Sequence, residues 1–178
     1  MGTLKTTNIQ TITGSGTLTL GTSGETVSFA SGVTGLNYPA FQASLSADQT
    51  VTNEVLTKLQ ADTEDFDTDN CYDNSTNYRF TPNVAGKYLV YTNFSFDSVT
   101  NDKNTQQRVR LHKNGSAIQS SWQILSSNER LVNMSPSFIV SMNGSSDYLE
   151  MFGFLSVISG GTPKFYRDTY FGAYRIGT

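Results

Sequence analysis

The sequence holds a single cysteine, a single histidine and four prolines among its 178 residues. One cysteine, Cys71, cannot form an internal disulfide framework, so the fold has to be held together by packing alone. Charged residues make up 15% of the chain, against roughly 25% in typical domains. With a net charge of −3, the chain lacks the basic field that attracts nucleic acids and anionic membranes. We therefore expect no nucleic-acid partner.

Long apolar runs are also missing. No segment approaches the ~18 to 20 consecutive apolar residues that cross a bilayer, and the opening MGTLKTTNIQ lacks the apolar stretch of a signal peptide. We therefore expect no membrane insertion, and synthesis in the cytoplasm.

What the chain does contain favours β-structure. It has 15 glycines, 9 tyrosines and 11 phenylalanines, together with many threonines and serines. Aromatic and β-branched residues are typical of strands, and glycine and serine are typical of the turns between them. The length suits one domain with an appended segment, so we divide the chain into an arm, residues 1–37, and a head, residues 38–178.

Apolar residues that alternate with a period of two locate the strands of the head. The clearest run is GKYLVYTNFSF, which places five side chains on one face: Tyr88, Val90, Thr92, Phe94 and Phe96. The Asn114-Gly115 pair lies between two more alternating runs and predicts a tight type I′ hairpin. Further strands are expected at 138–142, 148–158 and 169–176. Short strands with turn residues between them predict a sandwich or jelly roll.

An ordered series of short motifs points to a family. In chain order the motifs are Pro39-Ala40-Phe41, Phe66-Asp67, Tyr72-Asp73, Phe80-Thr81-Pro82, Gly86-Lys87-Tyr88, Lys113-Asn114-Gly115, Gly144 to Asp147 with Tyr148, and Tyr170-Phe171-Gly172. This order resembles the C1q-like branch of the tumour necrosis factor (TNF) superfamily over residues 39–176. The sequence departs from the family pattern at Gly144-Ser145-Ser146-Asp147, where a Gly-Asp pair is usual, and it has no collagen stalk.

The resemblance implies an all-β, ten-stranded jelly-roll sandwich that assembles as a compact homotrimer. In such a trimer, apolar and aromatic side chains line the threefold axis. The aromatic residues that we expect in the core or at trimer contacts are Phe41, Tyr88, Phe94, Phe96, Trp122 and Phe171.

The arm is poor in large side chains. The stretch TITGSGTLTLGTSGETVSFASGVTG, residues 11–35, has one acidic and one aromatic residue and cannot bury a core by itself. Low-charge segments of this kind ahead of a jelly roll resemble the N-terminal modules of tailed-bacteriophage virion proteins. We expect an extended β arm that docks on the particle or intertwines with other copies, through Ile9, Ile12, Leu18, Leu20, Val27 and Phe29. A disordered linker is the alternative.

Together the two resemblances imply a bacteriophage virion structural protein, either a capsid decoration protein or a short fibre. Its partners would be further copies of itself and capsid or tail components, and its place would be the virion surface. The alternative is a receptor-binding tail-fibre adhesin that recognises a host-surface glycan or protein through the grooves between subunits.

No motif carries catalytic chemistry. The only histidine, His112, lies beside the predicted hairpin turn, and no nucleophile-elbow motif is present. Cys71 lies among acidic residues, which disfavour its thiolate. We therefore expect no enzyme and no cofactor.

The acidic run ADTEDFDTDNCYDNST is the one segment with ligand potential. Asp65, Asp67 and Asp69 imitate the start of an EF-hand loop, and crowded carboxylates can bind Ca²⁺ in other geometries. The EF-hand pattern itself fails, because Asn70 stands where glycine is needed and Thr76 where glutamate is needed. The alternative is a solvated loop in which Asp side chains cap turns. Phe66 and Tyr72 are expected to pack against the domain.

Overall fold

A computed structural model describes residues 38–177, which form strands, turns and loops without a helix. None of these residues therefore belongs to a helix that could span a membrane. The strands are β1 (Ala40–Ser44), β2 (Gln49–Thr50), β3 (Thr57–Lys58), β4 (Thr63–Asp67), β5 (Tyr72–Asp73), β6 (Arg79–Phe80), β7 (Ala85–Asp97), β8 (Asn104–Lys113), β9 (Ser116–Glu129), β10 (Leu131–Met134), β11 (Ser137–Asn143), β12 (Leu149–Val157), β13 (Lys164–Phe165) and β14 (Tyr170–Gly177).

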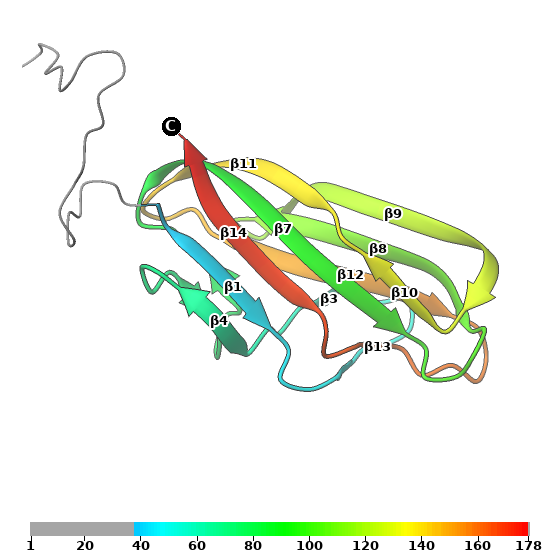
Figure 1. Cartoon of the computed structure of the whole chain (residues 1–178). Coiled ribbons are helices and arrows are strands. Elements are labelled where there is room, and N and C mark those ends of the chain that lie inside the picture. Colours follow the sequence, from blue (N-terminus) through cyan, green and yellow to red (C-terminus); the bar gives the residue numbers. More distant parts are fainter. Residues whose placement is uncertain (1–37, 178) are drawn as a thin grey trace, which may run out of the picture. The chain divides into compact units, whose positions relative to one another are not determined.

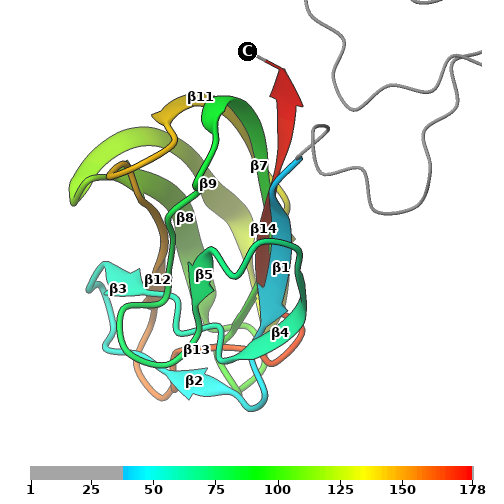
Figure 2. The same ribbon diagram turned by 90° about the vertical axis from the view of Figure 1, so that its left-hand side faces the viewer.

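The strands form two antiparallel sheets that pack face to face, as the two views show (Figure 1, Figure 2). The eight-stranded sheet has the order β2-β13-β7-β14-β1-β4, and β10 and β11 also pair with β7. The six-stranded sheet has the order β5-β6-β12-β8-β9, and β3 also pairs with β12. Strands distant in sequence are therefore neighbours, as when β1 pairs with β14 at the register Ala40 to Tyr174.

Strand β7 is the centre of the eight-stranded sheet and follows the predicted alternation. Its inward side chains are buried, whereas Leu89, Tyr91 and Asn93 lie on the outer face and are only partly covered. Because successive side chains of a strand point to opposite faces, one apolar series fixes which face enters the core. The inward series is Tyr88, Val90, Thr92, Phe94 and Phe96.

The predicted hairpin joins β8 to β9. Asn114 and Gly115 have φ angles of 52° and 78°, which is the backbone that a type I′ turn requires at both central positions. The Asn114 side chain stabilises the turn, since its Oδ1 accepts a hydrogen bond from Tyr148 N and its Nδ2 donates one to Asp147. The predictions of the β7 strand and of this hairpin are confirmed.

The core between the sheets consists mainly of aromatic rings. The Phe41 ring centroid lies 4.6 Å from that of Tyr72, 4.5 Å from that of Phe80 and 4.9 Å from that of Phe171. A second group joins Phe94 and Phe96 to Phe165, with centroid distances of 5.1 and 5.7 Å. Such stacked and edge-on pairs add to the stabilisation that burial gives.

The prediction of an all-β jelly-roll sandwich is confirmed. The structure divides it into more than the ten expected strands, because β2, β3, β5, β6 and β13 are two-residue segments. The expected arm, with Ile9, Ile12, Leu18, Leu20, Val27 and Phe29, lies outside the described residues.

Candidate functional site

The outer face of the eight-stranded sheet presents aromatic and aliphatic side chains to solvent. We call this surface the tyrosine face; its residues are Phe66, Leu89, Tyr91, Ile139, Tyr170, Tyr174 and Ile176. Four of them are large apolar groups that are roughly half exposed, Phe66 at 45%, Ile139 at 56%, Tyr174 at 43% and Ile176 at 45%. A contiguous apolar surface of this kind is a marker of an interaction site.

Strand register brings the tyrosine face together. Tyr174 lies opposite Leu89 of β7, and Leu89 in turn lies opposite Ile139 of β11. Because directly opposed residues of antiparallel strands have their Cβ atoms within about 5.5 Å, these three side chains form one row across the sheet. The next row contains Gln42, Gly172 and Tyr91.

Tyr91 is the fixed centre of this face. Its ring centroid lies 6.2 Å from that of Tyr170 and 6.3 Å from that of Tyr174, and its hydroxyl donates a 3.0 Å hydrogen bond to Gln42 Oε1. Burial, with a smaller effect of the neighbouring tyrosines, raises the pKa of Tyr91, so the hydroxyl remains a donor at neutral pH. Gly172 leaves the space that the ring occupies.

Strand β9 is the second exposed surface. It ends the six-stranded sheet, and nearly all of its 14 residues are exposed on both faces. Trp122 is 56% exposed and Ile124 is 68% exposed. An edge strand with unpaired backbone groups and apolar side chains is a template for association with another chain.

The six aromatic residues singled out from the sequence lie in two environments. Phe41, Tyr88, Phe94, Phe96 and Phe171 are buried in the core. Trp122 is not a core residue; it lies on β9, where the Arg108 guanidinium is 4.5 Å from its ring centroid.

The carboxylates of the acidic segment are already engaged in hydrogen bonds. Asp65 accepts a 2.7 Å hydrogen bond from Gln42 Nε2, and Asp67 accepts bonds from the backbone N–H groups of Asp69 and Tyr72. Within residues 38–177 no three His, Cys, Asp or Glu side chains are placed to hold a metal ion. The structure therefore does not bring the calcium candidates Asp65, Asp67 and Asp69 together as a ligand set.

Asp73 shows what these carboxylates do instead. It accepts hydrogen bonds from the backbone N–H groups of Ser75, Thr76 and Asn77 and from the Asn77 side chain. These bonds, with that from Thr76 the strongest, hold the pKa of Asp73 well below its ordinary value. The carboxylate thus caps a turn. Of the two aromatics expected to pack, Tyr72 is buried, but Phe66 is exposed because it lies on the outer face of β4.

Cys71 and His112, the two residues that could have acted as a nucleophile or a base, lie where they pack against other side chains. Burial, and then the charges of Asp67 and Asp69, raise the pKa of the buried Cys71 thiol, so the thiol stays protonated. The His112 ring stacks on Phe152 with a centroid distance of 4.2 Å, and burial lowers its pKa below the ordinary 6.5. A neutral imidazole stacked on a phenyl ring is a packing arrangement.

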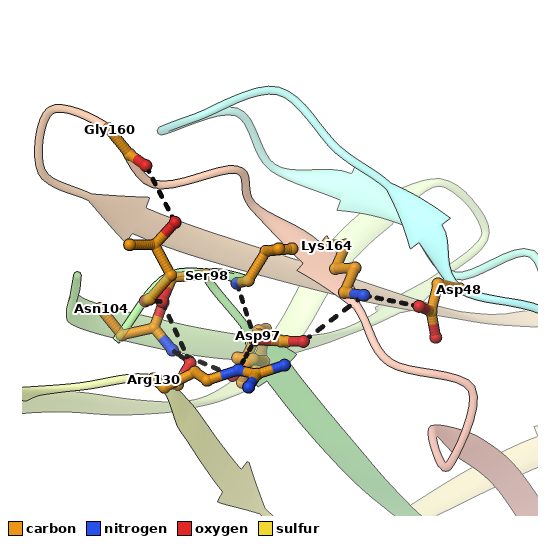
Figure 3. Close-up of polar contacts among 10 residues, drawn as sticks. Asp48, Asp97, Ser98, Asn104, Arg130, Gly160 and Lys164 are labelled. Carbon is orange, nitrogen blue, oxygen red and sulfur yellow. Dashed lines mark hydrogen bonds and ion pairs between the residues drawn. The ribbon is translucent and has the colours of Figure 1, made fainter. Parts of the chain in front are cut away.

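An ion cluster around the buried Asp97 ties together the loops at one end of the sandwich (Figure 3). The Asp97 carboxylate, 1% exposed, lies 3.3 Å from Arg130 Nε and 3.4 Å from Lys164 Nζ, and Lys164 also lies 2.6 Å from Asp48. Asn104 donates to the backbone carbonyls of Phe96 and Arg130. The two cations balance the negative charge of the buried Asp97 carboxylate. The cluster therefore holds together the segments that carry Asp48, Asp97, Arg130 and Lys164.

Sequence reasoning missed Tyr91, Tyr170 and Tyr174. Their signal was present, because Leu89, Tyr91 and Asn93 alternate with the buried series of β7. An outward series with a tyrosine and a leucine at its centre departs from the polar outer face that is common in antiparallel sheets.

Comparison with solved structures identifies the fold. No protein-family model matches the chain, and no curated protein matches it in sequence. The globular domain of a zebrafish complement 1qA protein is similar with a TM-score of 0.57 and 13% identity, over 79% of this chain and 98% of that one. Eiger TNF of S. frugiperda gives 0.54 at 11% identity, covering 79% and 92%, and murine APRIL gives 0.53 at 10%, covering 79% and 100%. The head of this chain therefore has the C1q/TNF-like jelly-roll fold.

Proposed function

We propose that the protein is a non-enzymatic homotrimer in which the tyrosine face forms the contact between subunits. The observation that carries this proposal is the row of Tyr174, Leu89 and Ile139 on the outer face of the eight-stranded sheet. A monomer would leave these side chains in water, whereas an interface core is enriched in tyrosine and other large apolar groups. The likeness of the fold to a C1q globular domain and to Eiger TNF supports an assembly of three subunits.

The exposed edge of β9 supplies the complementary surface. A closed ring needs two different patches on each subunit, so that each copy places one patch against the other patch of its neighbour. The tyrosine face and the β9 edge belong to different sheets and are distinct patches (Figure 2). Pairing one with the other around a threefold axis would cover the tyrosine face and the free edge of β9, and would leave the outer face of the six-stranded sheet, where Trp122 lies opposite Arg108, open.

We propose further that this trimer is a structural component of a bacteriophage virion, held by residues 1–37 and displayed on the particle surface after synthesis in the host cytoplasm. The support is the low-charge Thr/Gly/Ser composition of the arm.

Light scattering of the full chain in solution tests the trimer. The expected mass is three times the 19.5 kDa of one chain. Ile139→Asp and Tyr174→Asp should yield monomers, because a carboxylate at an apolar contact is desolvated without a partner. Ile158→Asp, at an exposed isoleucine in a loop at the far end of the sandwich, is the matched control and should remain trimeric. A monomeric wild-type chain would contradict the proposal.

Purified particles of the source phage test the attachment. Quantitative mass spectrometry should find the protein in the particle, and Ile12→Asp or Leu18→Asp in the arm should remove it while the trimer in solution persists. A copy number near that of the major capsid protein indicates decoration, and a few trimers per particle indicate a short fibre. Absence of the wild-type protein from particles would contradict a virion role.

The second candidate function is that of an adhesin that recognises a host-surface glycan or protein. The observation that favours it is the outer face of the six-stranded sheet, where Trp122 and Arg108 are stacked at the surface. Aromatic and arginine side chains are the most frequent anchors of recognition sites.

A further inference from the structure

The outer face of the six-stranded sheet carries a regular array of cationic and aromatic side chains. On β8, Arg108 and Arg110 point outward while Val109 and Leu111 enter the core. Because Arg108 and Arg110 are two residues apart on one strand, their Cα atoms lie ~6.8 Å from each other and both side chains leave the sheet on the same face. We call this surface the arginine–tryptophan face; it consists of Lys58, Arg108, Arg110, Trp122, Phe152 and Phe154.

Cross-strand register interleaves the charges with rings. Arg108 lies opposite Phe154 on one side and Trp122 on the other, and its guanidinium is 5.9 Å and 4.5 Å from the two ring centroids. In the next row, Phe152 lies between Lys58 and Arg110, with Lys58 Nζ 5.9 Å from the Phe152 ring centroid. Stacking occupies the flat face of a guanidinium and leaves its in-plane N–H donors available.

The arginines of this face have no carboxylate partner among the described residues. The nearby Glu150 forms an ion pair with Lys58, and Asp48, Asp97 and Asp147 form ion pairs with Lys164, Arg130 and Lys113. Two unpaired guanidiniums thus stand side by side on a chain whose net charge is −3. A cationic patch on an acidic protein is a local feature that suits an anionic ligand.

We propose that the arginine–tryptophan face binds an acidic polysaccharide, a chain of sugar rings that carry carboxylate groups. Arg108 and Arg110 would each donate two parallel hydrogen bonds to a carboxylate, the geometry for which the guanidinium fork is suited. The exposed ring of Trp122 would pack on the apolar face of a sugar. Alternating rings and carboxylates in the ligand then match alternating rings and guanidiniums on the sheet.

The small number of positive charges on this face favours an acidic polysaccharide over a nucleic acid. A nucleic acid carries a phosphate at every nucleotide and is held by an extended basic field, which this chain lacks. An acidic sugar polymer spaces its charges by whole rings and offers apolar ring faces between them. Two arginines and one exposed tryptophan suit that spacing better than a continuous line of phosphates.

The inference rests on the second candidate function, for which it names a ligand class on the same face, and it does not depend on the trimer contact of the tyrosine face. The arginine–tryptophan face lies on the six-stranded sheet, whereas the tyrosine face lies on the other sheet (Figure 2). Ligand binding is measured separately from the mass of the assembly, so failure of one proposal is distinguishable from failure of the other.

Binding of the full chain to immobilised polygalacturonate tests the proposal. The matched neutral ligand is the fully methyl-esterified polymer, which keeps the rings and removes the charges. The wild-type protein should bind the acid form at least tenfold more tightly than the ester, and the binding should weaken as salt screens the charges. Oligothymidylate serves as the polyanion of the other class and should bind more weakly than polygalacturonate.

Three variants assign the binding to this face. Arg108→Gln and Arg110→Gln together should lower the affinity on the order of tenfold to a hundredfold, since bonds to a charged group are among the stronger ones. Trp122→Ala, at an exposed position, should lower it several-fold. The control Lys103→Gln with Arg167→Gln removes the same charge from loops elsewhere and should bind as the wild type does.

The proposal is overturned if the ester binds as tightly as the acid, or if the double arginine variant binds as tightly as the control. Tighter binding of oligothymidylate than of polygalacturonate would also overturn it and assign the face to nucleic acid. Thermal melting of each variant should match that of the wild type, because the substituted side chains lie on the surface.

Discussion

The ring of Tyr91 on β7 occupies the space that Gly172 leaves open on the neighbouring β14. A Cβ atom at residue 172 would lie 2.4 Å from Tyr91 Cζ and 2.6 Å from its hydroxyl oxygen, closer than atoms approach in folded proteins. The missing side chain lets Tyr91 reach across β14 to Gln42 on β1. The shape of the tyrosine face therefore depends on a residue that contributes no side chain to it.

Gly172→Ala should disturb this surface. The added methyl group forces the Tyr91 ring away and breaks its bond to Gln42, at a cost of about 1–3 kcal/mol in the free energy of unfolding. The trimer should weaken as well, because the displaced ring lies at the proposed contact. Urea denaturation and light scattering over a dilution series measure the two effects. Gly177→Ala is the control, since a Cβ there meets nothing within 4 Å, and equal behaviour of the two variants would contradict the role given to Gly172.

Phe41→Ala should be among the most destabilising changes in the head. Phe41 is fully buried and its ring contacts the rings of Tyr72, Phe80 and Phe171. Its removal leaves a cavity between two sheets that cannot collapse onto each other, so we expect a loss of about 3–5 kcal/mol in the free energy of unfolding. The exposed Val55→Ala should change it by less than about 0.5 kcal/mol. A loss at Phe41 as small as that at Val55 would show that the described core is wrong.

The strands could be predicted because one face of each enters the core. The inward series of β7 and the Asn114-Gly115 turn are local signals, and the structure follows both. The alternation of Arg108 and Arg110 with Val109 and Leu111 carried a similar signal for the arginine–tryptophan face.

The pairing of distant residues could not be predicted from one sequence. Nothing local to Gly172 states that Tyr91, 81 positions earlier, will lie over it, because the register between β7 and β14 depends on the whole sandwich. The acidic segment is a second example. Its composition suggested a metal site, but its carboxylates bond to Gln42, to the turn after β5 and to backbone N–H groups, partners that only the fold brings near.

Asp97→Asn should loosen the end of the sandwich where Arg130 and Lys164 meet. In the wild type, Val99 N lies 2.7 Å from Asp97 Oδ1, and the asparagine side chain keeps an oxygen that can accept this hydrogen bond. The variant removes the negative charge that Arg130 and Lys164 share. Breaking a buried ion pair costs about 3–5 kcal/mol, and we expect the lower end because Arg130 can turn to water. Denaturant unfolding measures the loss, and Asp102→Asn on an exposed loop is the charge-matched control.

A double-mutant cycle separates this pairing from other effects of the substitution. Lys164→Met alone and together with Asp97→Asn should give losses that do not add, because each change removes the same contact. Additive losses would show that Asp97 and Lys164 do not interact in solution.

We expect low pH to destabilise the head near the β8–β9 hairpin, because the Asp147 carboxylate becomes protonated. Its carboxylate accepts hydrogen bonds from Asn114 Nδ2 at 2.8 Å and Asn143 N at 2.9 Å and lies 2.8 Å from Lys113 Nζ. These contacts, that with Lys113 first, hold the pKa of Asp147 below its ordinary 3.8. A carboxyl group whose pKa is lower in the folded than in the unfolded state stabilises the fold above the unfolded value. That contribution is lost as the pH falls through the folded value.

Asp147→Asn should therefore be less stable than the wild type at pH 7. The difference should shrink as the pH falls from about 4 through the lowered pKa of the folded state, because the carboxyl is protonated first in the unfolded chain and then in the folded one. Urea midpoints of both proteins at pH 7, 4, 3 and 2 give the comparison. The pKa values of Asp48, Asp62 and Asp73 are also lowered in the fold. These carboxyls titrate equally in both proteins, so their contributions cancel in the stability difference between the two. A difference that stays constant from pH 7 to pH 2 would mean that the charge of Asp147 does not stabilise the hairpin, and that its hydrogen bonds act through geometry alone.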